Sequence, residues 1–328
     1  MFSALLSSIL SFTLAASDRA IKIGWNAEWM QTGSTAAGGN GEGGRLDQLH
    51  HPRGIRFDDD DQSIYVADEY NHRIVQWKSN VNYGQLVAGG NGNGSEINQL
   101  YHPADIILNK KNNSLIIADR RNRRIVEWSR RNHSHVQVLL SDIDSRGLAM
   151  DKDGSIYISS YEEHAVKRWK VGDKHPVIIA GGNGEGDHFN QLRRPWSIFV
   201  DDDYSLYISD HNNHRVMKWL VGATEGRVVA GGNGHGNSKS HLNHPVGLAV
   251  DQFGRIYVAD CANDRVVRWD ADGKEGVVIV GGSGGHGKRH QSNELVCPFG
   301  LTFDRQGNLY VTDHWNYRVR KYSIQSKS

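Results

Sequence analysis

The chain has 328 residues, of which 38 are basic and 37 acidic, so its formal net charge is +1. A balance this even excludes the global field that draws basic proteins to nucleic acid or to membranes, so any binding surface must be local. Glycine fills 37 positions and apolar residues make up 38%, a composition typical of a turn-rich all-β protein.

The N-terminal residues 1–17 read MFSALLSSILSFTLAAS. About 13 apolar residues followed by small ones are typical of a cleavable secretory signal and are too few to span a bilayer. No positive charge precedes the apolar run, so an uncleaved tail is the alternative. Export would make three N-x-S/T motifs glycosylation acceptors. They begin at Asn93, Asn112 and Asn132.

The rest of the chain consists of one unit repeated six times. The units end on Trp77, Trp128, Trp169, Trp219, Trp269 and Tyr322, at spacings of 51, 41, 50, 50 and 53 residues. Short alternating runs such as GIRF and SIYVA, separated by Asp, Asn and Gly turns, predict four antiparallel strands in each unit. Six such units predict an all-β, six-bladed β-propeller of four-stranded antiparallel blades.

Ring closure also follows from the pattern. The last unit lacks its fourth strand, and an unmatched GSTAAGG stands at 33–39, ahead of the first unit. We expect this N-terminal strand to complete the last blade, which removes the open sheet edges. The predicted organisation is therefore a signal peptide at 1–17, a lead-in at 18–33 and a single propeller domain at 34–328.

The segments ADEYNHRIVQW and SDHNNHRVMKW, which contain Asn71-His72-Arg73 and Asn213-His214-Arg215, resemble the NHL repeat. The resemblance covers roughly residues 34–322 and implies the same six-bladed propeller. NHL proteins include sensor domains, modules that recognise RNA or protein, and a few lyases. The resemblance therefore leaves the function open.

Five of the six units share the pattern D-x-x-N-x-R. These side chains either form a ring of ligand groups or close the turn between the second and third strands. In the third unit Ser160, Glu163 and Ala165 replace all three, which favours a buried structural pair, because losing one partner alone leaves an unpaired charge that costs ~3 kcal/mol or more. The predicted pairs are Asp68 with Arg73, Asp119 with Arg124, Asp210 with Arg215, Asp260 with Arg265, and Asp313 with Arg318.

A glycine-rich loop, such as AGGNGEGDHFNQLRRP at 180–195, enters every unit except the third. The spacing G-x-G-x-x-G at 282–287 is found in dinucleotide sites, but here a strand follows in place of the required helix, so no nucleotide is expected. The third unit lacks both the loop and the turn pattern. We therefore expect each loop to pack on the turn of the unit that it enters.

The positions that precede the first strand carry His51, His102, His244 and Cys297 in adjacent units. These residue types bind zinc, so a metal site at the channel mouth is one hypothesis. Points on a propeller rim lie too far apart to share an ion easily, and no cofactor is expected. Cys297 has a simpler partner in Cys261, which lies on the same rim, and an isolated cysteine pair in an exported protein predicts a disulfide.

The NHL propeller also resembles the zinc-dependent amidating lyase, whose metal histidines follow the proline. Here those positions hold no histidine, which argues against that lyase. Strand alternation points them into the central channel. The candidate ligand-binding residues are thus Arg53, Arg146, Trp196 and Phe299, although they would also serve simply to plug the channel.

We expect a secreted, monomeric, non-enzymatic module that binds protein, peptide or glycan on its loop-rich rim, without a nucleic-acid partner or a membrane span. One alternative is a metal-dependent lyase or hydrolase with its site at the channel. Another is a recognition propeller of the ubiquitin-ligase or RNA-regulatory type. The basic run RRNRR at 120–124 would suit RNA, but Arg124 belongs to a structural pair and export would remove RNA as a partner.

Overall fold

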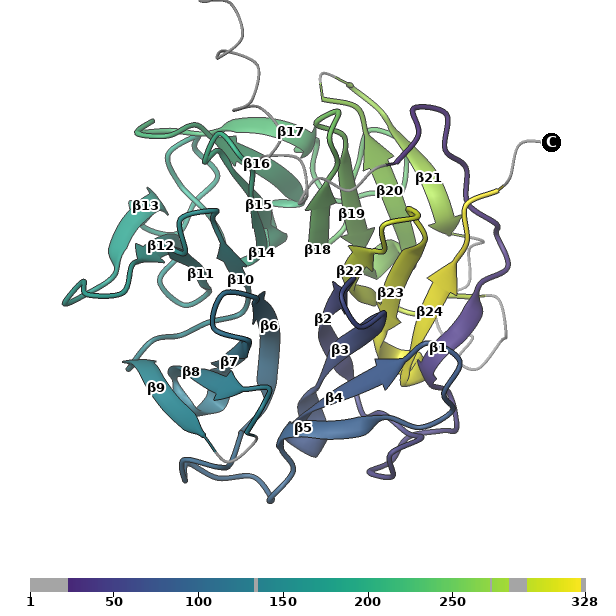
Figure 1. Ribbon diagram of the computed structural model, residues 1–328. Coiled ribbons are helices and arrows are strands. Elements are labelled where there is room, and N and C mark those ends of the chain that lie inside the picture. The colour runs from purple at the N-terminus through teal and green to yellow at the C-terminus, as the bar shows by residue number, and fades with distance from the viewer. Residues whose placement is uncertain (1–22, 133–134, 272, 283–293, 326–328) are drawn as a thin grey trace, which may run out of the picture.

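The computed structural model describes residues 23–132, 135–271, 273–282 and 294–325, so the predicted signal peptide lies outside the described residues. These residues form six four-stranded antiparallel sheets arranged as blades around a central axis (Figure 1). The first strand of each blade lies at the axis and the fourth at the perimeter. The predicted six-bladed β-propeller is confirmed.

Each of the first three blades runs outward from the axis in chain order. Blade 1 consists of β2 (Pro52–Asp58), β3 (Ser63–Asp68), β4 (Arg73–Lys78) and β5 (Gln85–Gly89). Blade 2 consists of β6 (Pro103–Asn109), β7 (Ser114–Asp119), β8 (Arg124–Ser129) and β9 (Val136–Ser141). Blade 3 consists of β10 (Leu148–Met150), β11 (Ile156–Ser160), β12 (Ala165–Trp169) and β13 (Val177–Gly181).

The other three blades follow the same plan. Blade 4 consists of β14 (Pro195–Val200), β15 (Leu206–Asp210), β16 (Arg215–Trp219) and β17 (Arg227–Gly231). Blade 5 consists of β18 (Pro245–Val250), β19 (Ile256–Asp260), β20 (Arg265–Trp269) and β21 (Gly276–Gly281). Blade 6 combines β22 (Pro298–Phe303), β23 (Leu309–Asp313) and β24 (Arg318–Tyr322) with β1 (Ser34–Gly38).

A single 3₁₀ turn joins the second and third strands wherever the D-x-x-N-x-R pattern occurs. These turns are η1 (Glu69–Asn71), η2 (Arg120–Asn122), η3 (His211–Asn213), η4 (Cys261–Asn263) and η5 (His314–Asn316). The residue after each turn is left-handed, with φ between 51° and 56°. The chain therefore reverses tightly on one face of the ring, which we call the turn face.

The hydrophobic core lies between blades. Strand β3 is buried along its whole length, because a neighbouring blade covers each of its faces. One cluster joins Tyr65 and Ile74 of blade 1 to Ile106 and Ile117 of blade 2. A blade on its own would leave such surfaces exposed, so the repeats stabilise one another by stacking.

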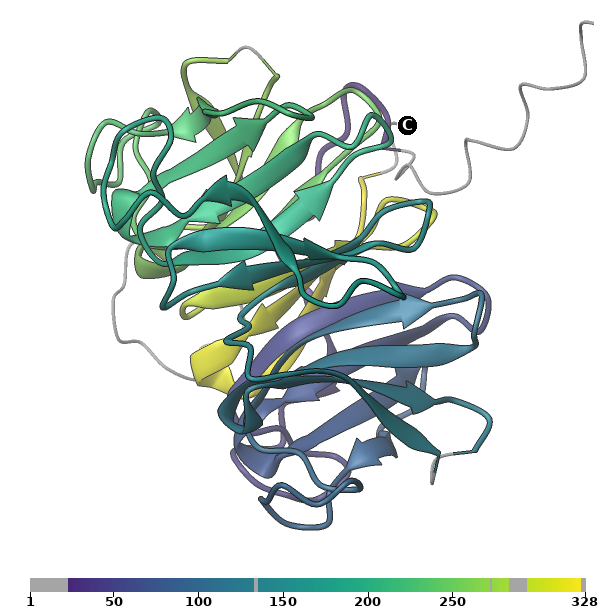
Figure 2. The ribbon, with the colours of Figure 1, turned by 90° about the vertical axis from the view of Figure 1, so that its left-hand side faces the viewer.

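The N-terminal segment closes the ring, as the sequence predicts: β1 pairs antiparallel with β24. The preceding residues, part of the predicted lead-in, are also packed. Trp29 is 2% exposed, and its indole N–H donates to the Gly307 carbonyl at 3.0 Å. The Arg255 guanidinium donates to the Trp25 carbonyl at 2.6 Å. Figures 1 and 2 show this segment beside the C-terminal strand, where it covers blades 5 and 6.

Glycines let the inner strands approach closely and so narrow the channel. A Cβ at Gly247 would lie 2.1 Å from the Phe299 carbonyl oxygen of the next blade, and one at Gly300 would lie 2.5 Å from that of Arg53. Side chains larger than hydrogen cannot occupy these positions without moving backbone. The resulting waist separates a mouth on the turn face from a wider opening at the opposite end.

Candidate functional site

The repeated Asp, Asn and Arg residues form buried structural sets. In blade 1 the Asp68 carboxylate accepts hydrogen bonds from Arg73 Nε at 2.7 Å, Asn71 Nδ2 at 2.8 Å and the His50 backbone N–H at 2.7 Å. The corresponding Asp–Arg pairs of blades 2, 4, 5 and 6 are also buried and 2.7 to 2.8 Å long. All these groups are satisfied inside their own blades, so they form no ring of ligands.

Each described glycine loop packs on the turn of the blade that it enters. The Arg73 guanidinium donates to the carbonyls of Gly44, Arg45 and Gln48. Farther along the loop, the Leu46 carbonyl accepts the Gly84 N–H at 2.7 Å, at the start of the outer strand. The loops therefore hold the outer strand of the blade that they enter, and Arg73 has a structural role in which it donates four hydrogen bonds.

The left-handed residue after the turn has a role that our sequence interpretation missed. His72 Nδ1 accepts the backbone N–H of His102, which lies in the next blade, at 3.2 Å. His164 and His214 accept from Arg194 and His244 in the same way. Asp264 does so for Cys297 with a carboxylate oxygen at 2.8 Å. The available signal was the recurrence of a His 30 residues before the residue that precedes the next proline.

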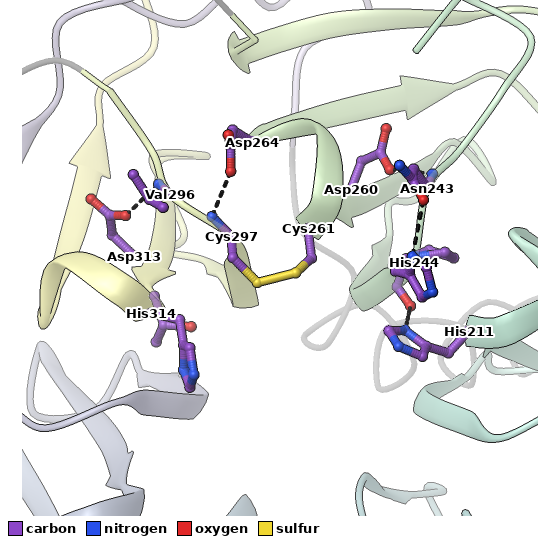
Figure 3. The surroundings of a disulfide bond; sticks show 12 residues. His211, Asn243, His244, Asp260, Cys261, Asp264, Val296, Cys297, Asp313 and His314 are labelled. Atoms are coloured by element: carbon purple, nitrogen blue, oxygen red, sulfur yellow. Dashed lines mark hydrogen bonds between the residues drawn. A yellow bond between two sulfur atoms is a disulfide. The ribbon is translucent and has the colours of Figure 1, made fainter. Parts of the chain in front are cut away.

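In four of the five turns, the first residue forms a second link across the seam to the next blade. His211 donates to the Pro245 carbonyl at 3.0 Å, and His314 donates to the Pro52 carbonyl at 3.1 Å. At the seam between blades 5 and 6 this link is the predicted disulfide, Cys261–Cys297, with an S–S distance of 2.00 Å (Figure 3). The cysteines thus replace a hydrogen bond at a position that already joins blades.

The four candidate zinc ligands are not brought together. Cys297 is in the disulfide, and His51 packs against Tyr70, His314 and Trp315. Burial followed by repulsion from His50 lowers the pKa of His51 to about 4. His102 faces Glu69, while His244 lies beside His211 and His214. In the described ranges no three His, Cys, Asp or Glu side chains are placed to hold an ion.

The four candidate ligand-binding residues, by contrast, meet at the axis on the turn face. The Arg53 guanidinium lies 5.0 Å from the Phe299 ring and 5.2 Å from the Trp196 ring. Arg146 also lies 5.2 Å from Trp196, and 4.3 Å from the Tyr161 ring. We use the term channel mouth for these four residues together with Tyr161 and with the residues that contact them, which the next three paragraphs describe.

Two charged residues that the sequence interpretation did not select complete the mouth. Glu69 is fully buried; its carboxylate accepts from Arg53, and from Arg120 Nη2 at 2.9 Å, and it lies 3.3 Å from His102 Nδ1. Burial alone would raise the pKa of Glu69, but the Arg53 charge, the His102 contact and the Arg120 charge outweigh it and lower the pKa to about 2. Glu69 is therefore an anion surrounded by cations.

The cations of the mouth are incompletely paired. Among the described residues, no hydrogen-bond acceptor contacts three buried nitrogens, namely Arg53 Nη1, Arg120 Nε and Arg146 Nε. Burial, then repulsion from Arg146 and Arg53, lowers the pKa of Arg120 to about 10. Burial and the Arg53 charge also lower the pKa of Arg146. The site therefore holds excess positive charge.

The opposite half of the mouth, from blades 4 to 6, is apolar. Val246, Cys297 and Phe299 form a buried cluster, with Trp196 and Trp315 packed against it. The Phe299 ring also stacks on His314, with centroids 4.2 Å apart. The mouth is thus divided into a cationic half from blades 1 to 3 and an aromatic half from blades 4 to 6.

The other end of the channel is a funnel of about 520 Å³ lined mainly by apolar side chains, including Met150 and Phe199. The cations at its edge have partners; Lys110, for example, lies 3.0 Å from Asp60. A cavity of about 30 Å³ occupies the waist. Below it, Arg56 donates to Asp105 at 3.2 Å and to the Leu148 carbonyl at 3.0 Å, which separates the funnel from the mouth.

The asparagines of the three predicted glycosylation motifs, Asn93, Asn112 and Asn132, are exposed. No helix in the described part of the chain has the length and apolar character needed to cross a membrane.

Comparison with known proteins finds a repeat model that matches two segments and solved structures that share the fold. The model of the NHL repeat matches residues 49–77 and 242–269. A protein of unknown function from Bacteroides thetaiotaomicron is 15% identical, with a TM-score of 0.72, over 91% of this chain and 77% of its own. An auxiliary nutrient binding protein from the same organism is 16% identical, with a TM-score of 0.68, over 91% and 78%.

A gluconolactonase from Xanthomonas campestris is 13% identical, with a TM-score of 0.61, over 93% of this chain and all of its own. Curated proteins provide no match. At such identities the solved structures establish the fold alone. The repeat match and the six-bladed ring together show a β-propeller that contains NHL repeats in blades 1 and 5.

Proposed function

We propose that this NHL-repeat propeller is a secreted, non-enzymatic module that binds a protein, peptide or glycan at the channel mouth. The observation that carries the proposal is the pairing of an under-neutralised arginine cluster with an aromatic surface at the axis. Perturbed charges and aromatic groups that converge on a concavity are typical of binding sites. The glycine loops have structural contacts, so the ligand is expected nearer the axis than the rim.

Two further features support secretion. A disulfide joins blades 5 and 6, and such bonds persist in oxidising compartments. One structural neighbour is named as an auxiliary nutrient binding protein. Another is named as a gluconolactonase, so an enzyme with its site at the channel is the competing proposal.

The test is binding of the purified chain to glycan and peptide arrays, compared with two variants. Trp196→Ala removes a mouth residue, whereas Val171→Ala alters a side chain that is 76% exposed away from the mouth. We expect Trp196→Ala to abolish binding and Val171→Ala to preserve it. Binding that survives Trp196→Ala would place the site elsewhere. Turnover of a lactone or other substrate that requires stoichiometric bound metal would overturn the non-enzymatic proposal.

A further inference from the structure

We propose that the channel mouth binds an organic carboxylate, with the carboxylate on the arginine half and an adjoining apolar ring or chain on the aromatic half. This inference rests on the proposed function, because it names the chemical group that the ligand presents there.

The first argument is charge. Arg53 and Arg120 both contact the carboxylate of Glu69, and Arg146 lies close enough to repel both of them. The carboxylates of Asp144 and Glu162 attract Arg146 electrostatically, but Asp144 accepts the Glu162 backbone N–H at 2.9 Å. Within the described residues, these three arginines therefore share one directly contacting carboxylate.

Neighbouring histidines do not change this balance. Burial lowers the pKa of His211 and of His314 to about 3, so both are neutral at physiological pH. Each also uses its Nδ1–H for a carbonyl in the next blade. Arg194 lies 5.3 Å from the Tyr161 ring and adds another cation at the edge.

The second argument is hydrogen bonding. The side chains of Arg53 and Arg120 are 12% and 11% exposed, yet each has a buried N–H that no described acceptor contacts. Buried polar groups without partners are rare because they lose their bonds to water. Guanidinium groups bind carboxylates through paired N–H donors, and these charge-assisted bonds are among the strongest that side chains form. An entering carboxylate would supply the missing acceptors of Arg53 and Arg146, both of which line the waist cavity.

The third argument is shape and polarity. The waist cavity below the mouth measures about 30 Å³, which holds about two water-sized atoms. The two oxygens of a carboxylate fit such a space, whereas a ring does not. The rest of the ligand must therefore remain above, beside Trp196 and Phe299 of the aromatic half, whose ring centroids lie 5.5 Å apart. Inorganic anions would leave this half of the mouth unused.

The test is calorimetric titration of the full chain with hydrocinnamate, which combines a carboxylate with a phenyl ring. Its uncharged amide and propionate are the controls for charge and for the ring. We expect hydrocinnamate to bind at least about tenfold more tightly than either control, since a hydrogen bond to a charged group is worth that factor or more. Equal affinity for the acid and the amide would overturn the proposal, as would inorganic phosphate binding as tightly as hydrocinnamate.

Variants locate the site. Arg146→Gln is expected to weaken hydrocinnamate at least about tenfold. Phe199→Ala, in the funnel, should leave the affinity unchanged. If Phe199→Ala weakened hydrocinnamate and Arg146→Gln did not, the binding site would lie in the funnel and the proposal would be overturned. Thermal unfolding without ligand checks that each variant is folded. Arg146→Lys, which keeps the charge but loses the paired donors, is the second variant should Arg146→Gln not fold.

Two outcomes separate this inference from the proposed function. Array binding that depends on Trp196, with no binding of hydrocinnamate, would retain the binding module and overturn the carboxylate. Binding of hydrocinnamate, with no ligand found on the arrays, would retain the carboxylate site and overturn the proposal that the mouth binds a protein, peptide or glycan. A dipeptide that ends in phenylalanine, compared with its C-terminal amide, distinguishes a peptide terminus from a free small acid as the source of the carboxylate.

Discussion

Glu69 is the residue whose removal tests the electrostatics of the channel mouth most directly. Glu69→Gln keeps the size of the side chain but removes the one anion that contacts Arg53 and Arg120 among the residues that the structure describes. The pKa of Glu69 falls from its ordinary 4.5 to about 2 in the folded protein, which corresponds to about 3 kcal/mol of stability at neutral pH. Breaking a buried ion pair by deleting one partner costs a similar ~3 to 5 kcal/mol.

Urea unfolding of the wild type and Glu69→Gln measures this loss. Glu225→Gln is a matched control, because Glu225 is exposed, and exposed substitutions change stability by at most about 0.5 kcal/mol. Adding Arg120→Gln to Glu69→Gln should recover part of the loss, since it removes a cation that has lost its partner.

The pH dependence provides an independent check on the same residue. Because the folded pKa of Glu69 is depressed, its contribution is complete above pH 4.5 and is lost as the pH falls toward about 2. The gap between wild type and Glu69→Gln should therefore narrow over that range. A loss below about 1 kcal/mol at pH 7, or a gap that is unchanged at pH 2.5, would refute this account of the mouth.

Three further predictions concern stability. Replacing Cys261 and Cys297 together by serine should cost about 4 kcal/mol of unfolding free energy, because the disulfide closes a span of 36 residues; urea curves of the variant should not respond to reductant, whereas those of the wild type should. Burial lowers the pKa of His314 to about 3. The unfolded state therefore takes up a proton below pH 6.5 that the folded state does not, so the free energy of unfolding should decrease as the pH is lowered from 6.5 to 3. His314→Gln should make that slope shallower by about 1.4 kcal/mol per pH unit, and an unchanged slope would contradict the neutral assignment. Trp29→Ala should cost about 3 to 5 kcal/mol because Trp29 is 2% exposed, while Trp25→Ala, at 60% exposed, should cost much less; equal thermal shifts would show that residues 23–31 do not hold the ring closed.

The fold was predictable because every level of the sequence repeats with the same period. The closing aromatic residues, the alternating runs and the turn pattern all indicate four strands per unit, and the unmatched GSTAAGG indicates closure by β1. Blade 3 lacks both the loop and the turn pattern, and this joint loss predicts the contact between the loop and the turn that Arg73 makes with the loop carbonyls. Comparison between repeats of one chain carried this information without any related sequence.

The mouth was only half predictable for a physical reason. Strand alternation identifies Arg53, Arg146, Trp196 and Phe299, because alternate residues of an inner strand face the axis. Glu69 and Arg120 come from the turns, and their direction depends on left-handed residues and on contacts with the next blade. Such contacts join positions about 50 residues apart, which local periodicity does not reveal.

The repeats nevertheless contain a signal for these residues. Where the motif occurs, Asp, Asn and Arg are constant because each blade needs the same turn, but the residue after the Asp differs: Glu69, Arg120, His211, Cys261 and His314. That position makes the second link to the next blade in four of these five turns, through an ion pair, a hydrogen bond or a disulfide. Arg120 is the exception, and it turns its charge toward Glu69. In a closed ring of equivalent blades, a constant residue therefore marks what folding requires, and a variable one at the axis marks where blades became different. Variation at the turn supplies Arg120, and variation at the position after the first-strand proline or its equivalent supplies Arg53 and Arg146, so the cations gather in blades 1 to 3, which is the reason to seek the ligand there.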